Sequence, residues 1–279
     1  MTVERPPRVG VETPLAGSRF ELHYADGEKP GVRVDPDGIE GYVHSCETCG
    51  TLDGPGMRYV LFLTGCQLRC QYCHNPDTWH LKHGRKTTVQ EVMAEIGKYA
   101  DFLNRYKGGV TVSGGEPLVQ TAFLARILRR CKELGLHTAL DTNGYLGHRV
   151  RGQLMEDIDL FLLDLKSWDR ETYVALTGVD PGPTFEFARR LSESGKAMWV
   201  RFVLVPGLTD AEDNVEGLAE FVATLNGVER VEVLPFHKMG EYKWRELGLK
   251  YRLAETEPPT PALLERVREQ FAARGVTVV

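Results

Sequence analysis

The chain has 279 residues, of which 42% are hydrophobic and 26% are charged, as in ordinary globular proteins. Its net charge of −5 argues against general nucleic-acid binding, because proteins with that function usually carry a basic excess. No apolar run approaches the ~20 residues of a membrane span, and the N-terminal stretch lacks the apolar core of a signal peptide. Six cysteines in such a chain indicate a reducing cytoplasm, where clustered thiols bind metals or do redox work more often than they form disulfides.

The first part of the chain differs in composition from the rest. Residues 1–40 are rich in proline, glycine and charge, which predicts a poorly ordered N-terminal extension. Packing signals begin near Gly41, and no internal repeat or low-complexity block follows. We therefore expect residues 41–279 to form one core domain.

From Arg58 onward, short apolar runs alternate with stretches of helical periodicity. The runs predict six strands, at residues 59–63, 109–112, 137–140, 160–163, 198–205 and 231–234. Between the first two strands, Thr88 and Glu91 have the spacing of a capping box that opens a helix. Strands that alternate with helices predict right-handed βαβ units and therefore a parallel sheet. The periodicity leaves open whether this sheet closes into a barrel.

Polar residues follow the predicted strands, at the positions where parallel α/β folds place their chemistry. The first strand leads into a cysteine-rich loop and the second into residues 113–117. Later strands lead into Asp141, into residues 164–166 and into His237. Because the carboxyl ends of parallel strands share one face, we expect these residues to converge on a single pocket above the cysteines.

The cysteine loop carries Cys66, Cys70 and Cys73 in a C-x3-C-x2-C spacing. Three soft thiolates in so short a stretch indicate a metal site that has three protein ligands and leaves a fourth position open. A closed Cys3His zinc site with His74 as the fourth ligand is an alternative. A thioredoxin-type redox pair is a weaker alternative, since it does not use Cys66.

The other three cysteines are interpreted differently. Cys46 and Cys49 form a second C-x2-C pair, which we expect not to bind metal because no third or fourth cysteine stands beside it. An electron carrier with a closed four-cysteine cluster would need one of this pair as its fourth ligand. Cys131 lies on the apolar stripe of a predicted helix and is expected to be a core residue.

The stretch after the second strand contains the paired glycines Gly114 and Gly115, followed by Glu116. Paired glycines allow a ligand to approach the backbone closely, and the carboxylate of Glu116 can receive an ammonium group. The same stretch could instead be a tight turn into a helix. The residue pattern alone does not separate the two interpretations.

Four further polar residues have a structural alternative or a chemical requirement. Asp141 and Asp164 could be helix caps, a common role for aspartate after a strand. Lys166 stands so near a buried run that its ammonium needs an anionic partner. A histidine such as His237 is, taken alone, more often a satisfied core residue than a ligand contact.

The three cysteines, with the aromatic Tyr72 before the last of them, resemble the cluster signature of the radical S-adenosylmethionine (SAM) enzymes. The similarity is closest to the activating enzymes of glycyl-radical enzymes, and it runs from about Gly41 to Val279. The stretches that carry it, in order, are residues 51–58, 62–66, 72–79, 113–116, 140–144, 163–166 and 234–237. Together these stretches are very specific, whereas singly only the cysteine trio is a strong signal.

One feature of the chain departs from that family, and another separates its short members from its longer ones. The first forty residues have no counterpart that we can place. Residues 82–85 lead straight into the first helix, so the ferredoxin-like insertion with extra C-x2-C motifs that many related activases carry is not found after the cysteine loop. This favours the short, pyruvate formate-lyase type over the longer types.

The resemblance implies an α/β fold with a parallel six-stranded, partial TIM-type (β/α)6 barrel. It also implies one [4Fe-4S] cluster held by Cys66, Cys70 and Cys73, with the amino and carboxylate groups of SAM on the fourth iron. One electron from a donor such as flavodoxin or ferredoxin would cleave a carbon–sulfur bond of SAM. The resulting 5′-deoxyadenosyl radical would take a hydrogen from one glycine of a partner glycyl-radical enzyme, so no general base, nucleic acid or membrane is required.

The resemblance further implies a set of cofactor-binding residues. The expected set is Tyr72, Cys73, His74, Gly114, Gly115, Glu116, Asp141, Asp164, Leu165, Lys166 and His237. Residues 114–116 would hold the methionine amino group of SAM, and Lys166 would pair with its carboxylate. Asp164 would orient the ribose or that carboxylate, directly or through a monovalent cation near Asp141. The aromatic and imidazole rings of the set would border the adenine.

One residue outside this set is expected to contact the protein substrate. Asp53 lies beside the cysteine loop in sequence, so it would receive the glycine-bearing loop of the partner through an arginine. Two other functions stay open at this point. One is a different radical SAM enzyme, either an activase of anaerobic ribonucleotide reductase, which residues 51–58 disfavour, or an enzyme that acts on a small molecule. The other is a zinc-stabilised binding module, which metal analysis would separate by about one zinc against four irons per chain.

Overall fold

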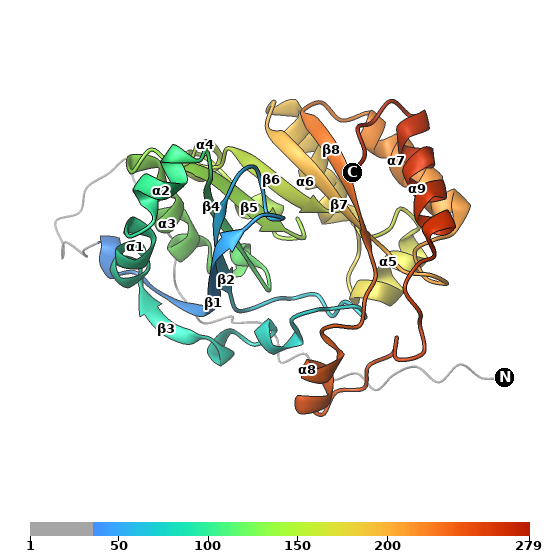
Figure 1. Ribbon diagram of the computed structural model, residues 1–279, viewed down its shortest axis with the longest axis horizontal. Coiled ribbons are helices and arrows are strands. Elements are labelled where there is room, and N and C mark those ends of the chain that lie inside the picture. Colours follow the sequence, from blue (N-terminus) through green and yellow to red (C-terminus); the bar gives the residue numbers. More distant parts are fainter. Residues whose placement is uncertain (1–35) are drawn as a thin grey trace. The chain divides into compact units, whose positions relative to one another are not determined.

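The computed structural model describes residues 36–279, which fold around one open, mostly parallel sheet of eight strands (Figure 1). The strands are β1 (Glu40–Gly50), β2 (Arg58–Leu63), β3 (Arg85–Thr88), β4 (Gly109–Gly114), β5 (His137–Thr142), β6 (Leu160–Asp164), β7 (Ala197–Leu204) and β8 (Val228–Pro235). Their order in the sheet is β3-β1-β2-β4-β5-β6-β7-β8. The strands from β2 to β8 pair in parallel, whereas β1 is antiparallel to both β2 and β3.

Helices connect the parallel strands and bury their apolar faces against the sheet. They are α1 (Val89–Gly97), α2 (Ala100–Arg105), α3 (Thr121–Glu133), α4 (Gln153–Glu156), α5 (Arg170–Thr177), α6 (Gly182–Glu193), α7 (Glu212–Ala223), α8 (Glu241–Glu246) and α9 (Pro261–Ala273). Short 3-10 turns are η1 (Pro36–Gly38), η2 (Pro76–Thr78), η3 (Leu81–His83), η4 (Pro117–Gln120) and η5 (Gly147–Arg149). Helix α1 packs beside α3, and α7 packs beside α9 next to β7 and β8 (Figure 1). The capping box of Thr88 and Glu91 is present as predicted.

The six predicted strands are all present and parallel, but the predicted six-stranded sheet needs a correction, because the sheet has eight strands. The two additional strands, β1 and β3, form its antiparallel edge. Much of β1 is exposed or half-buried, so it contains no apolar run of the kind that marks a strand buried on both faces. Strand β3 has only four residues, all of them polar, and three of them are exposed or half-buried.

The predicted N-terminal extension, residues 1–40, falls almost entirely outside the described residues. Residues 36–38 form η1, and β1 begins at Glu40. The described residues all belong to one compact unit. None of the described helices is both long enough and apolar enough to cross a bilayer.

The core of the sheet fixes the position of the loops at its carboxyl edge. Val60 and Leu63 of β2 are fully buried, and so are the central residues Val110 and Val112 of β4. Strands β2 and β4 are paired up to Leu63 and Gly114, so both end at the same level of the sheet. The cysteine loop and the loop that contains the paired glycines therefore leave the sheet side by side.

Candidate functional site

The cysteine loop is tied down on two sides by backbone hydrogen bonds. On one side, Gly65 and Cys66 donate to the carbonyls of Thr78 and Trp79, at 2.7 and 3.1 Å. On the other side, the backbone of residues 69–71 donates two hydrogen bonds, of 2.8 and 3.0 Å, to carbonyls at the end of α5. These hydrogen bonds therefore fix the conformation of the loop at the carboxyl edge of the sheet.

The paired glycines are required by the close approach of this loop. Gly114 has a φ of +130°, and a Cβ atom there would lie 2.0 Å from the carbonyl oxygen of Leu63. A Cβ atom at Gly115 would lie 2.5 Å from the carbonyl oxygen of Gly65 and 3.1 Å from Cβ of Cys66. Contact of these glycines with a cofactor stays a prediction. The absence of a side chain is already explained at Gly114 by the backbone of Leu63 in β2, and at Gly115 by the cysteine loop.

The three thiols of the loop lie in a low-dielectric environment. Burial and the neighbouring Cys70 raise the pKa of the Cys73 thiol to about 12, and they raise the pKa of the Cys66 thiol further. Burial also raises the pKa of the Cys70 thiol, and the ammonium group of Lys166 opposes this shift. Thiols with such pKa values stay protonated on their own, and they can ionise together only beside a compensating positive charge such as bound metal ions supply.

Two other polar atoms at the loop also lack a hydrogen-bond partner among the described residues. The hydroxyl of Tyr72 and the side-chain carbonyl of Gln67 are buried and have no hydrogen-bond partner among residues 36–279. Most buried polar side-chain atoms do have a partner, so two orphaned atoms beside three thiols mark a place built for a group that the protein itself does not supply. The donor set and these orphaned atoms fit an iron–sulfur cluster with a polar ligand beside it.

The positions of His74, Cys46 and Cys49 bear on the zinc alternative and on a fourth cysteine ligand. His74 packs edge-on against His237, with ring centroids 5.1 Å apart. Among residues 36–279 no three His, Cys, Asp or Glu side chains, the loop cysteines included, are placed to hold one metal ion, so this geometry does not separate the zinc site from the cluster. Cys46 lies on β1 opposite Leu61 and is exposed, and Cys49 lies further toward the amino end of β2, whereas the cysteine loop leaves its carboxyl end.

Cys131 is fully buried in the apolar core on α3, which confirms its prediction as a core residue. The two histidines that were expected to border the adenine are brought together, as the His74–His237 contact shows. Whether they contact a cofactor stays a prediction.

Lys166 has the anionic partner that the sequence required. Its Nζ lies 2.9 Å from Oδ2 of Asp164, and it stands 5.5 Å from the ring centroid of Tyr72. Burial disfavours the charge on Lys166, but the carboxylate of Asp164 opposes burial, and the pKa of the ammonium is raised well above its usual value. Leu165, between the two charged residues, is fully buried and donates its backbone N–H to the carbonyl of Arg201. A permanent cation is thus fixed beside Tyr72 and Cys70.

Arg201 forms the centre of a second charge network. The sequence places Arg201 on the fifth predicted strand, but it indicates neither a role nor partners for this residue. Its guanidinium lies 3.5 Å from Asp53, 3.4 Å from Asp141 and 2.9 Å from Glu232. Ser113 donates a hydrogen bond of 2.6 Å to Asp141. Burial raises the pKa of Asp141 to about 6, and Arg201 limits the shift. The signal that could have identified Arg201 is an arginine in the middle of an otherwise apolar strand, since a buried guanidinium needs carboxylate partners.

Glu116 is fully buried and its carboxylate is bound by the protein. It accepts hydrogen bonds from the backbone N–H of Leu118 at 3.0 Å, from the hydroxyl of Thr142 at 2.9 Å and from the backbone N–H of Asn143 at 2.9 Å. Burial raises the pKa of Glu116 to about 7. In this arrangement Glu116 joins the ends of β4 and β5, and its expected contact with an amino group stays a prediction.

Helix α8 covers the cysteine loop, which sequence reasoning also missed. The indole N–H of Trp244 donates to the carbonyl of Cys73 at 2.9 Å, and its ring packs edge-on against Trp79. Lys243 donates to the side-chain carbonyl of Asn75 at 2.8 Å. From the β5 side, Asn143 places its side-chain amide 3.8 Å from the sulfur of Cys66. A tryptophan in a short polar helix was the available signal, because such a ring needs a surface to cover.

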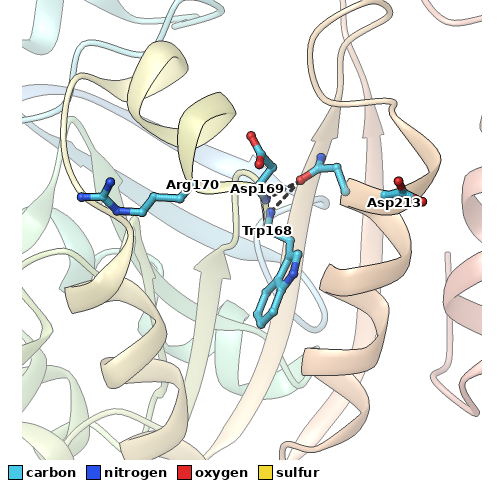
Figure 2. A pocket seen from close by; sticks show the side chains of 5 residues that line it. Trp168, Asp169, Arg170 and Asp213 are labelled. Atoms are coloured by element: carbon cyan, nitrogen blue, oxygen red, sulfur yellow. Dashed lines mark hydrogen bonds between the residues drawn. The ribbon is translucent and has the colours of Figure 1, made fainter.

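A pocket of about 320 Å³ lies between the amino ends of α5 and α7, lined by Trp168, Asp169, Arg170, Asp213 and Asn214 (Figure 2). The side-chain oxygen of Asn214 accepts hydrogen bonds of 2.8 Å from the backbone N–H groups of Trp168 and Asp169, as the dashed lines in Figure 2 mark. It also accepts one from Ser167. The pocket contains none of the predicted site residues. The side-chain amide of Asn214 instead fixes the backbone of the residues that follow Lys166.

Comparisons with known proteins identify the family of the chain. The Radical SAM superfamily profile matches residues 60–222. Over 232 residues the chain is 43% identical to the pyruvate formate-lyase 1-activating enzyme of Escherichia coli K12, covering 82% of this chain and 94% of that protein. Over 228 residues it is 44% identical to the pyruvate formate-lyase-activating enzyme of Staphylococcus aureus USA300, covering 79% of this chain and 91% of that protein.

Solved structures share the fold. A domain of a pyruvate-formate lyase-activating enzyme from Bacteroides vulgatus superimposes with a TM-score of 0.52 at 28% identity, covering 62% of this chain and 98% of that domain. SuiB of Streptococcus suis, bound to its precursor peptide SuiA, superimposes with a TM-score of 0.59 at 20% identity, over 78% of this chain and 46% of SuiB, and supports the fold alone. From the thiol loop, the profile match and the two curated relatives together, the chain belongs to the radical SAM superfamily and, within it, to the family of pyruvate formate-lyase-activating enzymes.

Proposed function

We propose that the chain is an oxidoreductase that activates a glycyl-radical enzyme, pyruvate formate-lyase, by removing a hydrogen atom from one of its glycines. The observation that carries this proposal is the convergence of three buried thiols with the orphaned hydroxyl of Tyr72 and the fixed cation of Lys166. A metal centre held by thiols alone needs no lysine beside it. The ammonium of Lys166 could pair with the carboxylate of an amino acid that the centre also binds.

Cys66, Cys70 and Cys73 would hold a [4Fe-4S] cluster and leave one iron without a protein ligand. When bound, the cluster and SAM supply one-electron cleavage of a carbon–sulfur bond, giving methionine and a 5′-deoxyadenosyl radical that abstracts hydrogen from the glycine. The rest of the chain positions these groups and keeps water away, since α8 covers the loop from the outside.

Lys166 would pair with the carboxylate of SAM, and Asp164 holds the lysine in place by the ion pair of 2.9 Å. Residues 114–116 would face the methionine amino group. Glu116 would contribute indirectly, because its carboxylate fixes the backbone of Asn143. Tyr72, His74 and His237 would border the adenine, supported by the contact of the two imidazoles.

We also propose that a monovalent cation binds between Asp141 and Asp164. Burial makes a charge on Asp141 costly, and Arg201 stands on one side of it only. A cation on the other side would neutralise the carboxylate and connect it to the carboxylate of SAM.

Asp53 would receive the glycine-bearing loop of the partner enzyme. Its carboxylate now faces Arg201, which is held as well by Asp141 and Glu232. An arginine of the incoming loop could therefore take over the contact with Asp53 while Arg201 keeps two carboxylates. The six parallel strands around this network would form the partial (β/α)6 barrel, with residues 1–40 as an extension to the core domain.

The test starts from protein purified without oxygen. Metal analysis should give about four irons per chain and no stoichiometric zinc. Reduction with dithionite in the presence of SAM should then yield 5′-deoxyadenosine and methionine in equal amounts. One zinc per chain, or a loaded cluster that leaves SAM intact, would contradict the proposal.

A further inference from the structure

Positive charge is concentrated around the cysteine loop although the whole chain is acidic, with a net charge of −5. Between Arg58 and Gln90 the only acidic residue is Asp77. The basic residues of the same stretch are Arg58, Arg69, Lys82, Arg85 and Lys86. Asp77 is already paired with Lys243 and His44, so it does not neutralise them.

Three of these basic residues are available to a partner. Arg58 is fully buried, and Lys86 is paired with Glu40. Arg69, Lys82 and Arg85 are exposed, and no ion pair joins them to any carboxylate within residues 36–279. We call these three residues the basic patch.

The basic patch is directly connected to the proposed cluster ligands. The guanidinium of Arg69 donates hydrogen bonds of 2.7 Å to the carbonyls of Cys66 and Leu68, and it stacks over the ring of Trp79. The carbonyl of Trp79 in turn accepts the backbone N–H of Cys66. Arg69 is thus hydrogen-bonded directly to the backbone of Cys66, one of the proposed cluster ligands.

The other two residues of the basic patch lie on segments that pack next to the start of the cysteine loop, Lys82 in η3 and Arg85 at the start of β3. Lys82 belongs to η3, which Thr64 holds through a hydrogen bond of 2.6 Å to the carbonyl of Leu81. Arg85 is paired across the sheet with Val43, and Val43 is paired with Leu63, the last residue of β2 before the cysteine loop. All three residues of the basic patch therefore belong to segments that contact the cysteine loop or its start.

We propose that the basic patch is the docking site of an acidic one-electron carrier protein that reduces the cluster. The proposal rests on the proposed function, which needs one electron per reaction. In the docking complex one electron passes from the reduced carrier to the cluster. No bond is formed or broken and no proton moves, and the carrier leaves oxidised by one electron.

The geometry favours the electron carrier over the glycyl-radical enzyme as the occupant. An electron can cross the few atoms of the cysteine loop, whereas removal of a hydrogen atom requires the glycine to touch the radical. The glycine must therefore enter beside Asp53 and Asp141, where carboxylates line the site, and no member of the basic patch is hydrogen-bonded or ion-paired to these residues. Unpaired surface cations next to a redox centre steer an acidic partner over about 10 Å at 0.1 M salt.

The test uses the cluster-loaded protein and an acidic flavodoxin as the probe. The variant Lys82→Glu/Arg85→Glu reverses two charges of the basic patch without touching the cysteine loop. Its matched control is Arg105→Glu/Lys107→Glu, which changes the net charge equally at the amino edge of the sheet, next to the start of β4. Binding is followed by the fluorescence anisotropy of the flavin at 50 and 300 mM salt, and cluster reduction by stopped-flow absorbance.

We expect the patch variant to raise the dissociation constant for flavodoxin about tenfold or more at 50 mM salt and to lose most of the salt dependence. The control variant should stay within about threefold of wild type. Reduction by dithionite, a small anion that needs no docking, should remain rapid enough for full SAM cleavage in both variants.

Two results would overturn the docking proposal. One is unchanged flavodoxin binding in the patch variant, or an equal loss in the control. The other is a patch variant that binds flavodoxin normally but no longer binds the glycyl-radical enzyme, because the patch would then serve the protein substrate. Failure of the proposed function is distinguished from both, since it would show as intact SAM after dithionite reduction of the wild-type protein.

Discussion

Gly115→Ala places one methyl group between the end of β4 and the cysteine loop. Its Cβ would lie 2.5 Å from the carbonyl oxygen of Gly65, whereas ordinary contact begins at 3.4 Å. The two segments must therefore separate by about 0.9 Å, because close-packed interiors leave no void that could absorb the difference. The backbone N–H of Glu116 donates to the same oxygen at 2.8 Å, so the separation also weakens this hydrogen bond.

The shift is large compared with the tolerance of a metal site. Distances between metals and their ligands are kept within about 0.2 Å, so a displacement of about 0.9 Å takes Cys66 out of position. We expect the anaerobically reconstituted variant to contain less than about half of the four irons per chain, and to cleave SAM in proportion. Overpacking of this kind costs about 1–3 kcal/mol of folding free energy, which circular dichroism of the cluster-free chain measures separately.

Gly97→Ala is the matched control for this experiment. Gly97 ends α1, and a Cβ atom there meets nothing within 4 Å. This variant should take up the full amount of iron and have a melting temperature equal to or above that of the wild type. A Gly115→Ala protein that also takes up the full amount of iron and binds SAM normally would refute the reasoning, because the loop would then not depend on the close approach.

Cys70→Ala should abolish the visible absorbance of the cluster and all radical formation. Cys46→Ser/Cys49→Ser should retain the iron content of the wild type. Loss of iron in the double variant would instead show that a cysteine of β1 is a cluster ligand. Lys166→Met should weaken SAM binding by about 10- to 100-fold, the worth of a hydrogen-bonded charge, with unchanged iron content, and a normal dissociation constant by calorimetry would exclude the proposed carboxylate contact. Asp141 has a pKa raised by burial from 3.8 to about 6, so the folded chain binds this proton more tightly than the unfolded chain, and the contribution of Asp141 to stability falls as the pH rises through that interval. Asp141→Asn should therefore lose less stability than the wild type between pH 4 and pH 6 in urea titrations of the cluster-free chain, and an equal or steeper loss would show that the carboxyl is not the titrating group.

The parallel strands could be predicted because burial on both faces demands an apolar run, and each of the six runs became a strand. The same logic could not find β1, since the partly exposed edge strand carries polar residues such as His44 and Glu47. Edge strands are defined by the partner they pair with, and that partner is not visible in local periodicity.

The site divides along similar lines. The cysteine trio is local in sequence, so its spacing was enough to single it out. The cost of a buried charge predicted an anionic partner for Lys166, but it did not name Asp164 as that partner. The network of Arg201 joins strands and loops that are far apart in sequence, and the cover provided by Trp244 depends on where α8 folds back. Such contacts are set by the tertiary arrangement. The role of Glu116 shows the same limit, because its partners Thr142 and Asn143 come from the next strand.

The most direct test of the central claim is electron paramagnetic resonance of the reduced protein mixed with SAM and pyruvate formate-lyase. If three cysteines hold a cluster whose fourth iron binds SAM, the doublet of a glycyl radical should appear on the partner enzyme and should be lost with Cys70→Ala. A fully loaded cluster whose signal is unchanged by SAM, with no glycyl doublet, would contradict the account.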